Sequence, residues 1–505
     1  MPAALLPFLS VLLLYLASPG PGFSFLAWGA LVPLFLFCKK SSPGRSALWG
    51  LAAGTLYHLL LVYWVTISME TYGGLQPLVS WPALLLLALY MALYFSLFCF
   101  LISKTKSRLP LLWFGPLLWV SLDYIRGFLL TGFPWMDLGY TQYKSPLLIQ
   151  TADLLGHHGI TFILILVNTL LAQIFVDRKW FRKNIKQACT ALLLLSIALG
   201  YSGIRPYHVR QDLQSSPTLQ VAVIQANIDQ ALKWQQDHKK TSLDRHLQLT
   251  RQARKENKAT LVIWPETALA FYPSHDPLMP YVEKETVQSD SFHLLTGAPY
   301  VLHRDTKYDY YNSALLLKPD GDPEIYFKQH LVPFGEYIPL RSILPIPKPI
   351  VESLGDFSAG TSGRPLNAGV AKIGTLICIE AIYPNLARHE TALGANILAN
   401  ITNDAWFGAS SAPVQHLAMA IFRTVENRRS MARAANTGIS ALILPTGEIL
   451  RQTGLFEQGF LSAELPLLNT TTFFTKAGFL FPLFSLAATL LLLGIFLKKK
   501  ARQVK

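Results

Sequence analysis

The C-terminal half of the chain is organised around residues 370–382, VAKIGTLICIEAI. Residues 374–377 form a short apolar run that predicts a buried strand, and Glu380 begins a segment typical of a helix start. Cys378 therefore lies on a predicted strand-to-helix elbow. Such an elbow holds its side chain out of the sheet and points backbone N–H groups at the atom under attack. The thiol is a candidate nucleophile, although a lone Cys is more often a small buried hydrophobe.

Apolar segments of membrane-spanning length dominate both ends of the chain. The chain has 505 residues, of which 51% are hydrophobic. A bilayer core is crossed by roughly 17–25 apolar residues, and runs of about this length occur near 2–18, 23–38, 47–67, 79–103, 109–122, 158–176, 187–204 and 477–497. We expect an α-helical membrane domain of seven spans over residues 1–205, an exported domain over 206–470, and an eighth span with a basic tail over 471–505.

The distribution of charge orients these spans. Clusters of Lys and Arg follow the second, fourth, sixth and eighth apolar runs. The loops near 19–22, 68–78 and 123–146, on the other side, carry only two basic residues, Arg126 and Lys144. Because basic residues favour the cytoplasmic side, both termini are expected in the cytoplasm and residues 206–470 outside it. Residues 210–470 hold 24 Lys and Arg against 25 Asp and Glu, so the net charge of +14 lies in the membrane-flanking segments. Nucleic acid is not an expected partner.

Cysteine usage sets Cys378 apart. The chain has four cysteines, and the other three lie in or beside predicted spans. Cys378 can therefore form no disulfide within the exported domain. A solitary thiol is a chemical liability in an oxidising compartment, which argues that the protein requires it.

Further site-like residues follow other predicted strands. Glu266 ends the strand predicted at 260–264, and Lys328 and Glu336 follow the short strand EIYF. A carboxylate at a strand end is typical of a site, although Glu is also common in solvated turns. Trp234, just past a strand at 218–228, is alone more typical of a packing aromatic. Strands alternate with helices expected at 232–257 and 413–433, which indicates an α/β or α+β class.

Three ordered motifs in this region resemble the nitrilase superfamily. They are WPE at Glu266, YFKQHLVPFGEYIP around Lys328, and ICIE around Cys378. The resemblance implies an αββα sandwich with a Glu, Lys, Cys triad. With a multispan membrane base and one trailing span, the whole chain resembles the apolipoprotein N-acyltransferase family. Members of that family often have an aromatic residue directly after the cysteine, whereas this chain has Ile379 there. The difference concerns a ring contact at that position and leaves the triad residues unchanged.

The residue types of this triad predict acyl transfer. A thiol is only slightly ionised at neutral pH, so Glu266 as base and Lys328 as cation would activate Cys378. Lys328 and the backbone N–H of Ile379 would stabilise the oxyanion. Collapse leaves a thioester, which an incoming amine converts to an amide in a ping-pong reaction.

The resemblance also implies the substrates and supporting residues. The donor would be a membrane phospholipid, and the acceptor the free α-amine of a diacylglyceryl-cysteine lipoprotein. It implies supporting roles for Trp234, Glu336 and Glu380, whose alternatives are a core ring, a structural salt bridge and a helix N-terminal acid. We expect no cofactor and no metal, a monomer in contact with membrane lipids, and a catalytic domain on the periplasmic side of the bacterial inner membrane.

Two other functions fit parts of the sequence. A membrane-tethered amidase or nitrilase would hydrolyse a C–N bond with water in place of the amine. A transporter or receptor would use the outer domain only to bind ligand, and it would tolerate loss of Cys378. We also expect residues 339–357, rich in Pro, Ile and Leu, to form an apolar arm that dips into the outer leaflet; packing on the domain's own core is the alternative.

Overall fold

The computed structural model describes residues 3–304, 307–339, 356–361 and 363–502. It divides into two compact units. The helical unit comprises Met1–Thr66, Pro77–Tyr207 and Ala477–Lys505, and the sheet unit comprises Ile67–Gln76 and His208–Lys476. Residues 340–355, which make up nearly all of the predicted apolar arm, lie outside the described residues.

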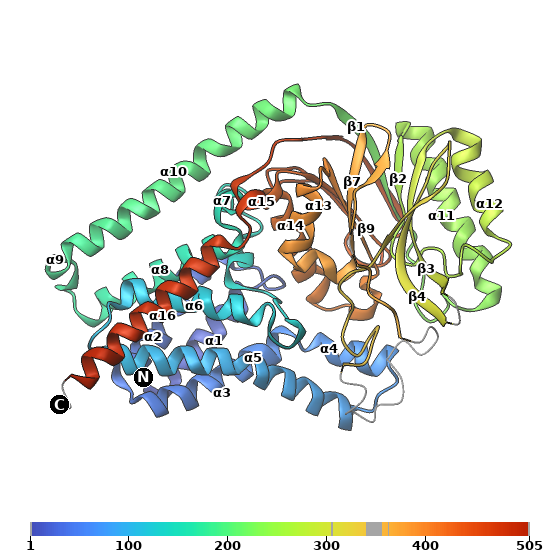
Figure 1. The fold of residues 1–505 in the computed structure, drawn as a ribbon. Helices are drawn as coiled ribbons and strands as arrows, with labels where there is room; N and C mark the ends of the chain where they lie inside the picture. Colours follow the sequence, from blue (N-terminus) through green and yellow to red (C-terminus); the bar gives the residue numbers. More distant parts are fainter. Residues whose placement is uncertain (1–2, 305–306, 340–355, 362, 503–505) are drawn as a thin grey trace. The chain divides into compact units, whose positions relative to one another are not determined.

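Long apolar helices build the helical unit (Figure 1). Its main helices are α1 (Leu6–Ala17), α2 (Val32–Lys40), α3 (Pro43–Leu61), α5 (Pro77–Thr105), α6 (Leu111–Arg126), α8 (His157–Val176), α10 (Ile185–Ser215) and α16 (Leu480–Ala501); the short ones are α4 (Trp64–Ile67), α7 (Ala152–Leu155) and α9 (Trp180–Lys183). The end of α10, from His208, belongs to the sheet unit.

The structure supports a smaller number of spans than the sequence predicted. Among the described residues, α5, α8, α10 and α16 are long and apolar enough to cross a membrane, and α3 continued by α4 across a 51° bend is a possible fifth. The expected spans near 2–18, 23–38 and 109–122 contain α1, α2 and α6, which have 12, 9 and 16 residues. Each is shorter than the ~20 helical residues that a bilayer core requires, so a count of eight is not established.

Two six-stranded sheets form the centre of the sheet unit. Their strand orders are β12-β1-β2-β3-β4-β5 and β11-β10-β9-β8-β7-β6. The strands of the first sheet are β1 (Thr218–Gln225), β2 (Leu261–Ile263), β3 (His293–Arg304), β4 (Lys307–Leu317), β5 (Glu324–Phe327) and β12 (Gly459–Pro466). Those of the second are β6 (Leu366–Ala368), β7 (Ala371–Ile377), β8 (Ile397–Thr402), β9 (Ser430–Ala435), β10 (Ala441–Ile443) and β11 (Ile449–Gln452).

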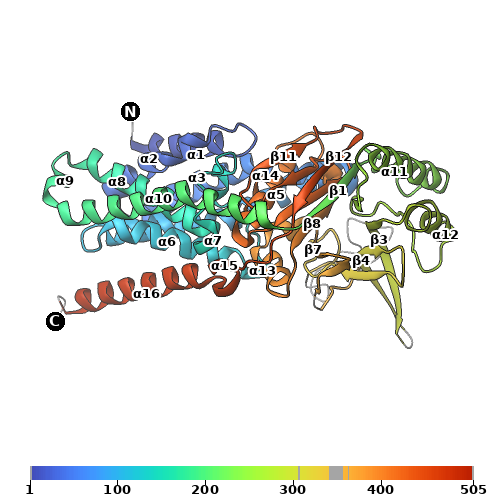
Figure 2. The same ribbon diagram turned by 90° about the horizontal axis from the view of Figure 1, so that it is seen from above.

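The sheets pack face to face because alternate side chains of each strand are apolar. Val221 and Val223 of β1 join Ile373 of β7 in the core between the sheets, whereas Ala222 and Ile224 of β1 face the covering helix. The outer layers are α11 (Gln236–Asn257) and α12 (Met279–Glu283) on one side and α13 (Pro384–Ala392) and α14 (Ala412–Asn427) on the other. Figures 1 and 2 show these four layers, which confirm the predicted αββα sandwich.

One excursion of the chain between α4 and α5 belongs to the sheet unit. It contains a single π-helical turn, η3 (Ser68–Tyr72). The hydroxyl of Ser68 donates to the carbonyl of Trp406 at 2.7 Å, and the rings of Tyr72 and Trp406 meet edge to face at 5.2 Å. A segment far away in sequence therefore contacts the 3-10 helix η8 (Asp404–Phe407), which follows β8.

The helix predicted at 413–433 is shorter than expected. α14 ends at Asn427 because Arg428 adopts a left-handed conformation, with φ 50°, and its N–H caps the carbonyl of Thr424. The chain then enters β9 at Ser430. Helix and strand are buried on every face, so no change of hydrophobic period marks the boundary.

Candidate active site

Cys378 stands at the predicted elbow. β7 ends at Ile377, and a 3-10 helix, η7 (Cys378–Ile382), follows directly. Cys378 has φ 52°, a left-handed conformation that costs a non-glycine residue roughly 1–3 kcal/mol and persists only where its surroundings hold it. Its carbonyl accepts hydrogen bonds from His416 Nε2 at 3.0 Å and Asn400 Nδ2 at 3.4 Å.

Glu266 follows β2 and is held on both carboxylate oxygens. Oε1 accepts from Asn312 Nδ2 at 2.8 Å, and Oε2 accepts from the backbone N–H of Asn403 at 2.9 Å. The backbone carbonyl of Glu266 accepts from Lys233 Nζ at 3.1 Å. Both its side chain and its backbone are therefore fixed, and Asn403 ties it to the end of the second sheet.

Lys328 follows β5 and lies between two carboxylates. Its Nζ is 2.8 Å from Glu336 Oε1 and 3.6 Å from Glu266 Oε1. Asn312 Nδ2 also donates to Glu336 Oε1, at 2.8 Å, and the N–H of Val332 donates to Oε2. Lys328 is 1% exposed, so its charge is compensated within the site rather than by water.

Burial and charge set the protonation of these groups. Burial lowers the pKa of Lys328, but the charges of Glu336 and Glu266 outweigh it, and the net shift is upward. Burial, then the charge of Glu266, raise the pKa of the Cys378 thiol, against the smaller opposing effect of Lys328. At neutral pH the resting site therefore holds a neutral thiol beside a charged lysine.

Glu380 connects the cysteine elbow to the lysine segment. Its carboxylate accepts from the N–H of Ile377 at 2.7 Å and from the N–H groups of Gln329 and His330 at 2.7 and 3.1 Å. Tyr326 donates a fourth hydrogen bond. Burial nevertheless raises the pKa of Glu380, to about 7. A carboxylate in this place fixes the end of β7 relative to the end of β5.

The structure thus brings five of the seven predicted site residues into one network: Glu266, Lys328, Glu336, Cys378 and Glu380. Ile379 is buried. Because it directly follows Cys378 in the chain, its backbone N–H belongs to the peptide bond that joins the two residues. Trp234 is half-buried, and within the described part of the chain no hydrogen bond or ring contact links it to the triad. Its neighbour Lys233 is the residue that touches Glu266.

Several polar residues of this network were missed by sequence reasoning. Asn312 lies within β4, Asn403 follows β8, and His416 lies within α14. The only available signal was the cluster of polar residues in TNDAWFG directly after the strand at 397–402.

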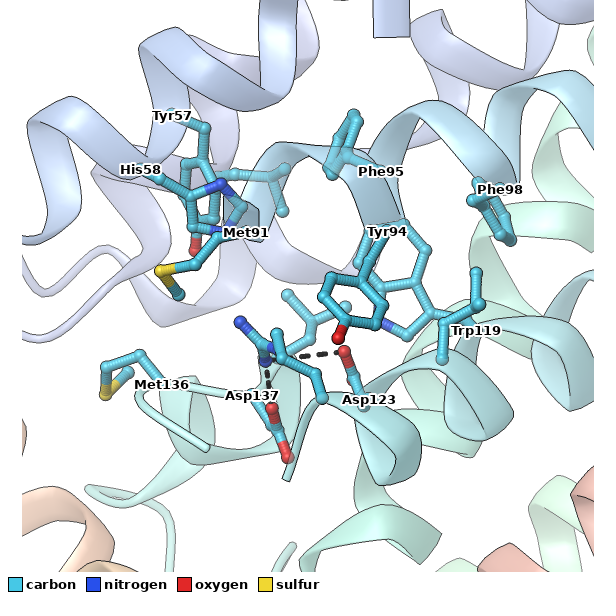
Figure 3. A pocket seen from close by; sticks show the side chains of 14 residues that line it. Tyr57, His58, Met91, Tyr94, Phe95, Phe98, Trp119, Asp123, Met136 and Asp137 are labelled. Atoms are coloured by element: carbon cyan, nitrogen blue, oxygen red, sulfur yellow. Dashed lines mark hydrogen bonds and ion pairs between the residues drawn. The ribbon is translucent and has the colours of Figure 1, made fainter. Parts of the chain in front are cut away.

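The helical unit contains a second buried polar cluster (Figure 3). Arg126 pairs with Asp137 and, at 3.4 Å, with Asp123, and Asp137 also meets His157 Nε2 at 2.8 Å. The cavity beside it has a volume of about 40 Å³, room for a few water molecules. Asp137, His157 and His158 have a spacing suited to a metal ion, but Arg126 and His157 already occupy both oxygens of Asp137.

Comparisons with known proteins cover both units. Residues 10–170 match the model of the apolipoprotein N-acyltransferase N-terminal domain, and residues 220–473 match that of carbon-nitrogen hydrolase. An apolipoprotein N-acyltransferase of Geobacter metallireducens is 38% identical over 98% of this chain and 96% of its own. One of Haemophilus ducreyi is 32% identical over 98% and 94%. The chain therefore belongs to the apolipoprotein N-acyltransferase family.

Proposed function

We propose that this acyltransferase moves a fatty acyl chain from a membrane phospholipid to the N-terminal amine of diacylglyceryl-cysteine lipoproteins, through a thioester on Cys378. The observation that carries the proposal is a buried thiol on a strand-end elbow, beside a lysine held between two carboxylates. The family supplies the substrate class.

The first half-reaction forms the thioester. Glu266 accepts the thiol proton as the sulfur attacks the ester carbonyl. Lys328 Nζ and the N–H of Ile379 stabilise the oxyanion, and each such donor is worth about 3–4 kcal/mol. The carbon–oxygen bond then breaks, and Glu266 returns the proton to the departing lysophospholipid alcohol.

The second half-reaction consumes the thioester. The α-amine of the acceptor attacks the carbonyl carbon, and Glu266 takes a proton from the nitrogen. The carbon–sulfur bond breaks, the amide leaves, and the proton restores the thiol. Glu266 thus serves as base and acid in both halves, whereas Lys328 and Ile379 act on the oxyanion in both.

The setting of the reaction is part of the proposal. We place the chain in the bacterial inner membrane as a monomer, with eight spans and the sheet unit on the periplasmic side. The proposed division is 1–205, 206–470 and 471–505, and no nucleic acid takes part. Support comes from the basic residues that follow alternate apolar runs and from the apolar helices α5, α8, α10 and α16.

The intact mass of the protein after incubation with phospholipid alone tests the proposal. An acyl adduct should form, should be released by hydroxylamine, and should be absent in Cys378→Ala. Adding a diacylglyceryl-cysteine peptide should discharge the adduct as amide. An adduct on another residue would refute the thioester, and fatty acid release without amide would favour the amidase alternative.

A further inference from the structure

A buried polar cluster lies behind the elbow and is not used by the proposed chemistry. It comprises Asn400 and Asp404 of the β8 end, His416 of α14 and Arg433 of β9. Each of these side chains is 0–1% exposed. Asp404 Oδ1 is 3.1 Å from His416 Nδ1, and Asp404 Oδ2 accepts from Arg433 Nη2 at 2.7 Å.

The arrangement resembles a Cys, His, Asp triad in composition but not in geometry. His416 Nε2 meets the backbone carbonyl of Cys378 at 3.0 Å rather than its sulfur. A carbonyl oxygen can only accept, so Nε2 carries the proton. Burial, and then the charge of Arg433, lower the pKa of His416. The Nε2–H is therefore committed to the Cys378 carbonyl.

The opposite side of the ring is fixed as well. Asp404 Oδ1 and Arg433 Nη2 each lie 3.1 Å from Nδ1 and hold this side of the ring. Arg433 also donates to Asn400 Oδ1, which turns the Asn400 amide towards the carbonyls of Leu376 and Cys378. One arginine thus orients both groups that donate to the Cys378 carbonyl.

Holding this carbonyl has a direct effect on the oxyanion site. The C=O of Cys378 and the N–H of Ile379 belong to one planar peptide unit and point in opposite directions when it is trans. Any rotation of the carbonyl therefore swings the N–H away from the oxyanion. Since Cys378 has φ 52°, a strained value, the peptide needs an external restraint.

We propose that His416 is a positioning residue that aims the Ile379 N–H at the oxyanion by holding the Cys378 carbonyl. This inference rests on the proposed function, since it assumes that an oxyanion forms at this thiol. It assigns no proton transfer to His416. It also predicts that substitution of His416 slows steps that pass through an oxyanion and spares those that do not.

Two reactions of the same sulfur separate these roles. Thioester formation from phospholipid passes through a tetrahedral oxyanion, whereas alkylation by iodoacetamide displaces iodide at a saturated carbon and forms none. His416→Asn retains an amide near the Nδ1 position but cannot reach the Cys378 carbonyl. We expect it to form thioester roughly 100-fold more slowly, the scale of a misplaced catalytic group, with an unchanged alkylation rate.

Matched variants complete the test. His416→Gln carries an amide N–H near the Nε2 position and should recover at least part of the lost rate. His246→Gln replaces another buried helix histidine, whose Nδ1 meets the Ser242 carbonyl, and should leave both rates unchanged. Melting temperatures establish that each variant is folded.

The contrary outcomes are distinct. A wild-type rate of thioester formation in His416→Asn would overturn the inference and leave the proposed function standing. Equal losses of acylation and alkylation would also overturn it, because His416 would then act on the thiol or on the fold. Failure of the wild-type protein to form any Cys378 adduct would instead refute the proposed function.

Discussion

Gly297 of β3 supports the turn that carries Glu266, and its replacement by alanine should displace the proposed base. A Cβ at this position would lie 2.4 Å from the backbone N of Thr267 and 2.6 Å from the Cα of Glu266. Ordinary contact begins at 3.4 Å, so about 1 Å of movement is needed. The clash is with backbone, which cannot rotate away as a side chain would.

The turn has little freedom to absorb this movement elsewhere. The N–H of Gly297 donates to the carbonyl of Pro265 at 3.2 Å, and its own carbonyl accepts from Leu269 at 3.1 Å. Thr267 already has φ 53°. A displacement of 1 Å in a catalytic group costs roughly 100-fold in rate, and overpacking of this kind costs ~1–3 kcal/mol in stability.

Single-turnover mass spectrometry would measure the effect. Gly297→Ala should form the Cys378 thioester roughly 100-fold more slowly, and it should transfer the acyl group to amine more slowly too, because Glu266 acts in both halves. Gly459→Ala on β12, where a Cβ meets nothing within 4 Å, is the control. A folded Gly297→Ala with wild-type rates would show that Gly297 does not position Glu266.

Two further predictions concern buried carboxyl groups. Burial, then the charge of Glu380, raise the pKa of Glu390 from 4.5 to about 8. The folded protein therefore holds this proton more tightly than the unfolded chain, so stability should fall as pH rises from 4.5 to 8, by up to ~1.4 kcal/mol per unit. Glu390→Gln should reduce that slope in melts at several pH values, and an unchanged slope would contradict it. Asp137→Asn leaves Arg126 with a weaker partner and should lower the melting temperature in detergent, since breaking a buried pair costs ~3–5 kcal/mol. Asp177→Asn removes an exposed partner of Lys183 and is the control, because its melting temperature should stay at the wild-type value. Equal melting temperatures for the two variants would refute the importance of the buried pair.

The sequence was informative wherever a polar residue ended an apolar strand. Cys378 and Lys328 each directly follow a strand, Glu266 lies three residues after one, and the change from apolar to polar marks all three. The pattern at 218–228, alternating at first and then continuously apolar, likewise predicted a buried strand. These signals are local, because strand ends and turn residues are set by neighbours in the chain.

The remaining features depend on contacts between distant segments. His416 lies within a helix that is buried on every side, so no pattern distinguishes it from a core residue. Asn312 acquires its position from β4 pairing, and Gly297 from the close approach of another loop. The transition from α14 to β9 was missed for the same reason, since complete burial removes the period on which such predictions rest.

The charges around Cys378 explain why its proton would pass to Glu266 rather than to solvent. With a neutral thiol, Lys328 and the two carboxylates of Glu266 and Glu336 sum to one negative charge. Loss of the thiol proton to water would raise the net charge of this buried site to two negative charges, which is costly. The raised pKa of Cys378 reflects this cost. Transfer to Glu266 keeps the sum at one and frees Lys328 from one of its carboxylate partners. The ammonium is then available to the oxyanion at the step in which negative charge leaves the sulfur for the carbonyl oxygen.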